Sequence, residues 1–130
     1  KEMGYYSDPY DDFGRLAMEI WRAARLVVDT GIHDKQWTRE QAVQYLMDNT
    51  PNPEGDARKA IDRYIVMPGQ ATAYKMGMLK ILELRKMAKA ELGDTFDIRD
   101  FHDVVLKDGA VPLAILEENV EAWVEEQKAT

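Results

Sequence analysis

The chain has 130 residues, of which 45% are hydrophobic and 32% charged, a balance typical of a folded protein with a core. The net charge of -7 argues against a nucleic-acid-binding surface, because phosphate contacts need clustered Lys and Arg side chains. The absence of cysteine excludes disulfides and thiolate metal ligands, and no apolar run approaches the roughly 20 residues of a membrane-spanning helix. We therefore expect a single domain over residues 1–130. Because the chain begins at Lys1 without a methionine, we also expect it to be a piece of a longer protein.

The first predicted helix carries two different faces. Gly4 after Met3 is typical of the end of an earlier helix, and Asp8 and Pro9 are typical of the cap and first turn of the next one. In the following stretch, Phe13 to His33, apolar residues recur at helical spacing and predict one buried face: Phe13, Leu16, Ala17, Ile20, Ala24, Val27 and Val28. Charged residues share another side of this helix, namely Arg15, Glu19, Arg22, Asp29 and His33, with Arg25 beside them. Such a polar stripe is equally compatible with solvent-exposed ion pairs and with the wall of a cleft.

Five further helices are predicted by their start and stop signals. Thr38 to Gln41 forms a capping box that opens a short helix ending at Asn49 to Pro53. The next helices are expected over residues 54–66 and 70–92, Asp97 is the expected N-cap of a helix reaching about Lys107, and Pro112 starts the last one. No convincing strand or glycine-rich phosphate loop is present. The sequence therefore predicts an all-α fold, an irregular array of about six helices with short connections.

Histidine and carboxylate spacing gives no complete metal site within this chain. A helical zinc site places two histidines at i and i+4 with a glutamate between them, and neither His33 nor His102 has such a partner. Asp29 and His33 do have this spacing, so they could form half a metal site or a hydrogen bond at the end of the helix. We expect no metal bound by this chain alone.

The helix interruption at Pro68-Gly69 is the second candidate site. A helix that breaks and restarts frees backbone groups and directs the positive end of the new helix at whatever lies there. Tyr64 and Tyr74 flank the interruption, and their hydroxyl groups could donate to a developing oxyanion or could simply be satisfied in the core.

Four segments together resemble one known family: the stretch from EMGYYSDPYDD to DTGIH, then QWTREQAVQYL, then RYIVMPGQATAYKMG, then the stretch from LELRKMAKAEL to GAVPLAIL. They occur in the order found in the C-terminal region of the bacterial domain-of-unknown-function family 885, and they cover nearly all of the chain. The resemblance implies a fragment of a large helical protein similar to zinc metallopeptidases of the oligopeptidase and peptidyl-dipeptidase type. Many members of that family are secreted or lipid-anchored, which implies a periplasmic or lipid-anchored location in bacteria.

The resemblance also implies roles for particular residues. His33, Tyr64 and Tyr74 fall in segments expected to face a metal-bound substrate, where they would act in catalysis, while Arg22, Arg25, Arg63 and Gln70 could position a peptide-like substrate. The zinc and its ligands would belong to the preceding, N-terminal part of the full-length protein, with which this chain would form the active-site channel. The chain alone would then be inactive, and its exposed half of the channel could lead to self-association.

Two functions therefore stay open from the sequence. One is the C-terminal part of a zinc-dependent, peptidase-like hydrolase that supplies substrate-binding and oxyanion-stabilising residues. The other is a non-catalytic helical binding or interaction module.

Overall fold

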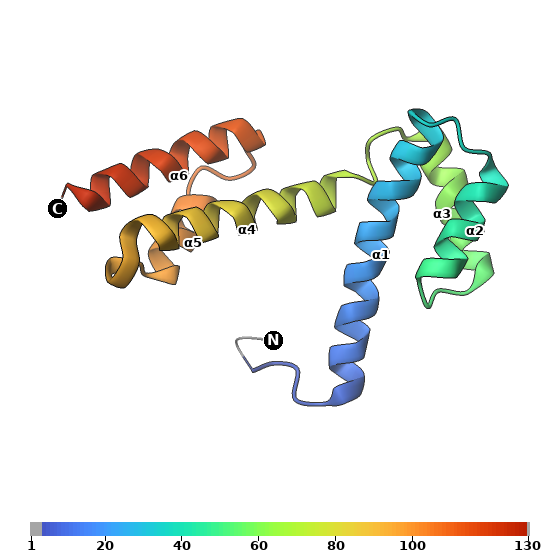
Figure 1. Ribbon diagram of the computed structural model, residues 1–130, viewed down its shortest axis with the longest axis horizontal. Coiled ribbons are helices and arrows are strands. Elements are labelled where there is room, and N and C mark those ends of the chain that lie inside the picture. The colour runs from blue at the N-terminus through green and yellow to red at the C-terminus, as the bar shows by residue number, and fades with distance from the viewer. Residues whose placement is uncertain (1–3, 130) are drawn as a thin grey trace. The chain divides into compact units, whose positions relative to one another are not determined.

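The all-α architecture expected from the sequence is confirmed by a computed structural model of the chain, in which residues 4–129 are described (Figure 1). The expected helix end at Met3 lies outside these residues. Within residues 4–129 there are six α-helices, one short 3-10 helix and no strand. The helices are α1 (Pro9–His33), α2 (Arg39–Asn49), α3 (Glu54–Val66), α4 (Ala73–Leu92), α5 (Ile98–Leu106) and α6 (Leu113–Lys128), with the 3-10 helix η1 at Gly93–Thr95.

The chain forms two compact units, Lys1–Met76 and Gly77–Thr130, and the boundary falls within α4. Each unit has its own hydrophobic core. The single domain expected from the chain length stays a prediction.

In the first unit, α2 and α3 pack against the C-terminal half of α1, as Figure 1 shows. The core is formed by apolar side chains of the three helices and by Ala71 of the α3–α4 connection: Ala24, Val28, Ala42, Val43, Leu46, Ala57, Ile61, Tyr64 and Ala71. The predicted caps are confirmed. The Asp8 carboxylate accepts from the backbone N–H of Tyr10, and both hydrogen bonds of the capping box between Thr38 and Gln41 are formed.

The N-terminal half of α1 differs from the sequence-based expectation. Of the apolar face predicted to be buried, Ala24 and Val28 are buried, whereas Phe13, Leu16 and Ile20 in this half are exposed, as is Val27 farther along at the edge of the buried face. The reason is the length of the neighbouring elements, because every buried residue of α1 lies at or after Ala24 and the first turns extend beyond α2 and α3 (Figure 1). Periodicity shows that a face is apolar, but it does not show which part of the chain covers it.

The connection between α3 and α4 is a compact turn at the predicted Pro68-Gly69 interruption. Gly69 has a φ of +78°, in the left-handed region that favours glycine, and successive turn hydrogen bonds link Gln70 N–H to Met67 O and Thr72 N–H to Gly69 O. Regular α4 therefore begins at Ala73 rather than at the predicted residue 70.

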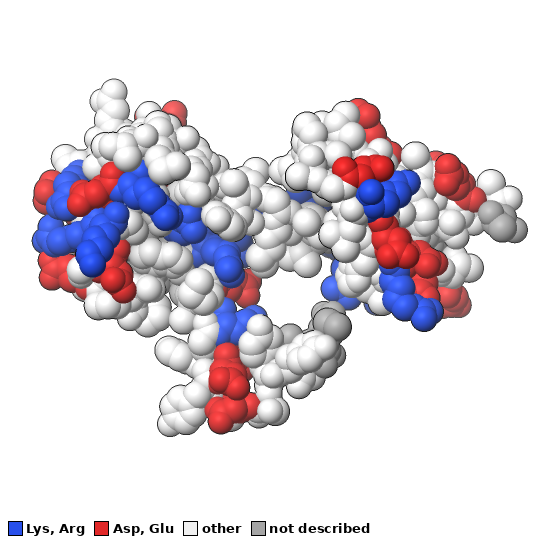
Figure 2. All heavy atoms as spheres, turned by 180° about the vertical axis from the view of Figure 1, so that it is seen from behind, with Lys and Arg blue, Asp and Glu red and all other residues white. Residues whose placement is uncertain are grey.

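In the second unit, the part of α4 from Gly77 packs with α5 and α6 around a core that includes Leu84, Phe101, Val120 and Trp123. Two lysines link α4 to α6: Lys80 Nζ lies 3.1 Å from Glu117 Oε1, and Lys128 Nζ lies 2.7 Å from Glu91 Oε2. On the face of the molecule in Figure 2, basic side chains lie beside acidic ones in both units.

Candidate polar site at the α3–α4 connection

The C-terminal half of α1 holds the α3–α4 connection by three polar contacts, one from each of three successive turns. The backbone N–H of Gly69 donates to Asp29 Oδ1 at 3.0 Å, and Arg25 Nη2 donates to the Gln70 side-chain oxygen at 3.2 Å. His33 Nε2 lies 2.9 Å from the backbone oxygen of Tyr64. Since a carbonyl oxygen can only accept, His33 carries its proton on Nε2 in this arrangement. Over this half of the helix, Arg25 and Asp29 of the polar stripe are thus buried against the helix interruption, whereas His33 is exposed.

Arg25 is the centre of this group of residues. Its side chain is 8% exposed, and its guanidinium carbon lies 5.3 Å from the ring centre of Tyr64 and 4.8 Å from that of Tyr74. A cation over a desolvated aromatic ring gains about 2 kcal/mol, so the two tyrosines partly replace the water that the guanidinium loses on burial. Among residues 4–129, no carboxylate forms an ion pair with Arg25.

Three buried polar atoms in this group have no hydrogen-bond partner among residues 4–129: Arg25 Nε, Asp29 Oδ2 and the Tyr64 hydroxyl oxygen. Asp29 is 3% exposed and Tyr64 is 1% exposed. An unsatisfied buried donor or acceptor costs about 1–3 kcal/mol, and such atoms are uncommon in folded proteins. Their concentration at one place makes this the candidate functional site of the chain.

Burial also controls the ionisation of Tyr64. Removal of its hydroxyl from water raises the pKa of Tyr64 above its ordinary value, while the positive charges of Arg25 and Arg63 oppose that shift. Arg63 lies with its guanidinium carbon 5.5 Å from the Tyr64 ring centre, but no hydrogen bond of normal geometry reaches the hydroxyl. Tyr64 is therefore a neutral phenol at physiological pH, with a proton available to donate.

Six of the seven residues predicted for the site come together here: Arg25, His33, Arg63, Tyr64, Gln70 and Tyr74. Tyr74 is 52% exposed, and Arg63 and His33 are also exposed, so these three are the accessible members of the group. Arg22 takes part in none of these contacts.

The sequence predicts Asp29 as a member of the charged stripe and as a partner of His33, but not as a residue that binds the α3–α4 turn. In the structure, Asp29 binds the turn and His33 binds the backbone of α3, so the two side chains do not form the expected hydrogen bond at the helix end. Burial of a carboxylate on the charged side of α1 marks Asp29 as a site residue. The sequence alone does not show this burial, because it depends on where the α3–α4 turn lies.

The N-terminal half of the polar stripe forms ordinary ion pairs. Arg15 binds Asp12 at 2.8 Å and Glu19 at 3.2 Å, and Lys75 of α4 lies 3.5 Å from Glu19. Pairs of this kind on a helix surface contribute only about 0.3–0.5 kcal/mol each. This part of the stripe is compatible with a solvent-exposed surface, unlike the part at Arg25 and Asp29.

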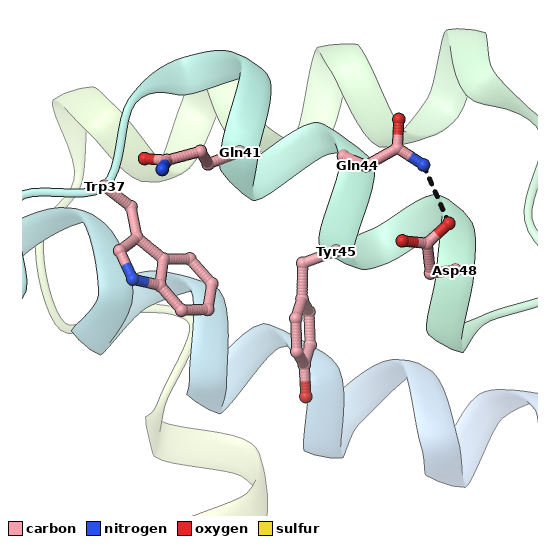
Figure 3. Close-up of a pocket in the computed structure, with 5 residues that line it drawn as sticks. All are labelled: Trp37, Gln41, Gln44, Tyr45 and Asp48. Atoms are coloured by element: carbon pink, nitrogen blue, oxygen red, sulfur yellow. Dashed lines mark hydrogen bonds between the residues drawn. The ribbon is translucent and has the colours of Figure 1, made fainter.

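A second concave region lies on α2 and is lined by Trp37, Gln41, Gln44, Tyr45 and Asp48, with a volume of about 390 Å³ (Figure 3). Gln44 donates to Asp48 at 2.7 Å, and the Gln41 side chain is used in the helix cap. The two aromatic rings, 5.5 Å apart, pack against the core of the first unit. Trp37 also lies against Gly31, where an added Cβ would come within 2.5 Å of the indole. We therefore interpret this region as part of the scaffold that fixes the end of α1.

Within residues 4–129, no group of three or more His, Asp or Glu side chains could hold a metal ion. The described residues therefore offer no site for the zinc that the family resemblance implies, and that resemblance assigns the zinc ligands to the preceding part of the full-length protein. None of the described helices is long and apolar enough to cross a membrane.

The fold and the polar group define an all-helical protein with a buried arginine and two tyrosines at a helix interruption. The chain belongs to the family described as "Bacterial protein of unknown function (DUF885)", whose sequence model matches residues 1–120. It is similar to a crystal structure described as "the putative lipoprotein from Colwellia psychrerythraea", with a TM-score of 0.94 and 57% sequence identity. That similarity covers 96% of this chain and 22% of the Colwellia chain, so our chain spans about a fifth of the length of that relative. Comparison with curated proteins gives no match.

Proposed function

We propose that this chain is the C-terminal part of a longer, zinc-dependent, peptidase-like hydrolase, in which it supplies one wall of the substrate channel. The observation that supports the proposal is the set of unsatisfied buried polar atoms on Arg25, Asp29 and Tyr64. A fold that only needed stability would gain from satisfying or removing these atoms. Their retention beside the exposed Tyr74 is consistent with a site arranged for a substrate.

The groups on the accessible side suit a peptide carbonyl oxygen. Tyr74 presents an O–H donor and Arg63 presents a guanidinium, while Arg25, over the Tyr74 ring and bonded to Gln70, is buried. Donors that are held in place before the reaction stabilise the negative charge that develops on a carbonyl oxygen when it is attacked. In this proposal Tyr74 is the donor that meets the substrate directly, and Tyr64, whose hydroxyl is buried, is a second donor that substrate binding would have to uncover. Arg22, Arg25, Arg63 and Gln70 would position the substrate.

His33 contributes to the proposed site through its hydrogen bond to the Tyr64 backbone. Its Nε2 proton is directed at the Tyr64 backbone oxygen, and so the imidazole holds the last turn of α3 next to α1. His33 would therefore act by positioning Tyr64 and the turn, with Nδ1 left as the nitrogen that could meet other groups.

The metal belongs to the part of the proposal that rests on the family resemblance. Zinc would polarise the substrate carbonyl and activate water when bound, and its ligands would lie outside this chain. A bacterial periplasmic or lipid-anchored location is proposed on the same basis, supported by the description of the Colwellia relative.

Turnover of peptides by the full-length protein tests the proposal. In that protein, Tyr74→Phe should lower kcat/KM about ten- to a thousandfold, as the loss of one oxyanion donor does. Tyr10→Phe is the matched control, because the same atom is removed from a tyrosine that is 86% exposed at the start of α1, outside the proposed site. It should leave kcat/KM unchanged.

Equal kcat/KM in the Tyr74→Phe variant and the unmodified protein would refute the assigned role. Peptide binding without turnover by the unmodified full-length protein would instead support the non-catalytic binding module.

A further inference from the structure

The exposed apolar residues on the N-terminal half of α1 form an ordered surface. Leu16 and Ile20, four residues apart, make a ridge along the helix, and both residues line two separate grooves. One groove, of about 430 Å³, has Phe13 and Ala17 on its α1 side and residues 48–51 opposite. The other, of about 300 Å³, has Glu19 and Ala23 on its α1 side and Lys75 opposite.

This arrangement has the geometry of a helix-packing surface. Rows of side chains at i and i+4 form ridges on a helix, and packed helices place such ridges in each other's grooves. Here the rows Phe13–Ala17, Leu16–Ile20 and Glu19–Ala23 are three neighbouring rows of this kind, with a groove on each side of the middle one. A helical partner with apolar side chains four residues apart can fill both grooves, whereas a flat surface would leave them empty.

The two grooves differ in polarity in a way that restricts the partner. The groove at Phe13 has apolar residues along α1, while the other has the Glu19–Lys75 ion pair at its edge. A partner helix with one row of apolar side chains and polar side chains along one margin would match both grooves. This is the pattern of an amphipathic helix in a folded protein, not of one buried on all sides.

The length of the related chain indicates where such a helix would come from. The fold is shared with the Colwellia protein over 96% of this chain, yet 78% of that protein lies outside the matched part, since 22% is covered. We infer that the Leu16–Ile20 ridge is the docking surface for an amphipathic helix of the longer polypeptide to which this chain belongs. This inference rests on the proposed function only in assuming a longer polypeptide, and it does not depend on enzymatic activity.

Thiol labelling tests the inference with a matched pair of positions. Leu16 and Met18 lie on the same helix, both are 49% exposed, and Met18 lines neither groove. The variants Leu16→Cys and Met18→Cys are made both in the 130-residue chain and in the full-length protein. The rate of reaction with a maleimide is followed by peptide mass spectrometry, so that cysteines elsewhere do not interfere.

The two cysteines should react at similar rates in the 130-residue chain. In the full-length protein the cysteine at position 16 should react at least about tenfold more slowly than the one at position 18, because a docked helix must open locally before the reagent can enter. Equal rates in the full-length protein would overturn the inference.

Other occupants would give distinct results. Protection of position 16 in the 130-residue chain that increases with protein concentration would show that a second copy covers the ridge, and this would overturn the inference. Protection that arises only on adding phosphatidylcholine and phosphatidylglycerol vesicles would show a lipid surface and would overturn it as well. The labelling pattern is read independently of turnover, so loss of the proposed peptidase activity would leave this result interpretable.

Discussion

Replacing Tyr64 by phenylalanine should stabilise the chain. The Tyr64 hydroxyl is buried without a hydrogen-bond partner, and removal of an unsatisfied buried polar atom recovers part of a cost of about 1–3 kcal/mol. The ring contacts with Arg25 and Arg63 are retained, because phenylalanine also presents an aromatic face to a cation. Allowing for a small void where the oxygen was, we expect a gain of about 1 kcal/mol.

The assay is thermal unfolding of the 130-residue chain followed by circular dichroism. For a compact unit of this size, a gain of 1 kcal/mol raises Tm by about 4–8 °C. Tyr10→Phe, at an exposed position, should leave Tm unchanged and so controls for the effect of the Tyr→Phe change itself. In the full-length protein, the same Tyr64→Phe variant should lose activity, because the proposed function uses this hydroxyl as a donor.

A fall in Tm for Tyr64→Phe would refute the reasoning, since it would mean that the hydroxyl has a partner in solution. An increase in Tm with unchanged activity would support the packing argument and count against the proposed role of Tyr64.

Three further predictions concern local features of the two units. Gly31→Ala should destabilise the fold by about 1–3 kcal/mol, because the added Cβ would come within 2.5 Å of Trp37. Gly14→Ala, in open space on the same helix, should stabilise the fold by about 1 kcal/mol. Equal effects of the two substitutions on Tm would contradict this prediction. Thr38→Ala should lower the free energy of unfolding by about 1 kcal/mol through loss of the α2 cap, whereas Thr38→Ser should keep the cap and the stability. Chemical denaturation of both variants measures the difference. The Arg99 guanidinium and backbone N–H lower the pKa of Asp97 to about 2. Between about pH 4 and pH 2 the unfolded state therefore binds more protons than the folded state, and the stability of the fold should decrease as the pH falls through this range. Asp97→Asn should weaken that pH dependence of Tm, and an unchanged profile would show that other carboxylates cause it.

Local sequence signals predicted the helices well because the physical causes are themselves local. The Asp8 cap, the capping box at Thr38 and the Asp97 cap each involve residues two or three positions apart, and all are formed as expected. Local hydrogen bonds also explain the one helix start that the sequence placed too early, that of α4. The turn bonds between Met67 and Thr72 use the residues that would otherwise form the first turn of this helix.

Burial was harder to predict, because it depends on elements far apart in the sequence. The apolar spacing on α1 predicted one buried face, but the structure buries only the part that α2 and α3 reach. The same limit applies to the site. The spacing of Arg25, Asp29 and His33 placed them near one another on α1, but only the folded chain showed that Gly69, Gln70 and the Tyr64 backbone are their partners.

Neighbouring elements bury side chains of α1 only from Ala24 onward, and this difference along the helix should affect its dynamics. From Ala24 onward one side of α1 is buried against α2, α3 and the turn, whereas the first turns, from Pro9 onward, depend mainly on the Asp8 cap and surface ion pairs. Backbone amides near the C-terminal end of α1 should therefore exchange with deuterium as slowly as the core of the first unit. Those of the first turns should exchange much faster, through local fraying. In the 130-residue chain, one continuous helix would thus contain both a slowly and a rapidly opening segment, and the transition should fall between Ile20 and Ala24.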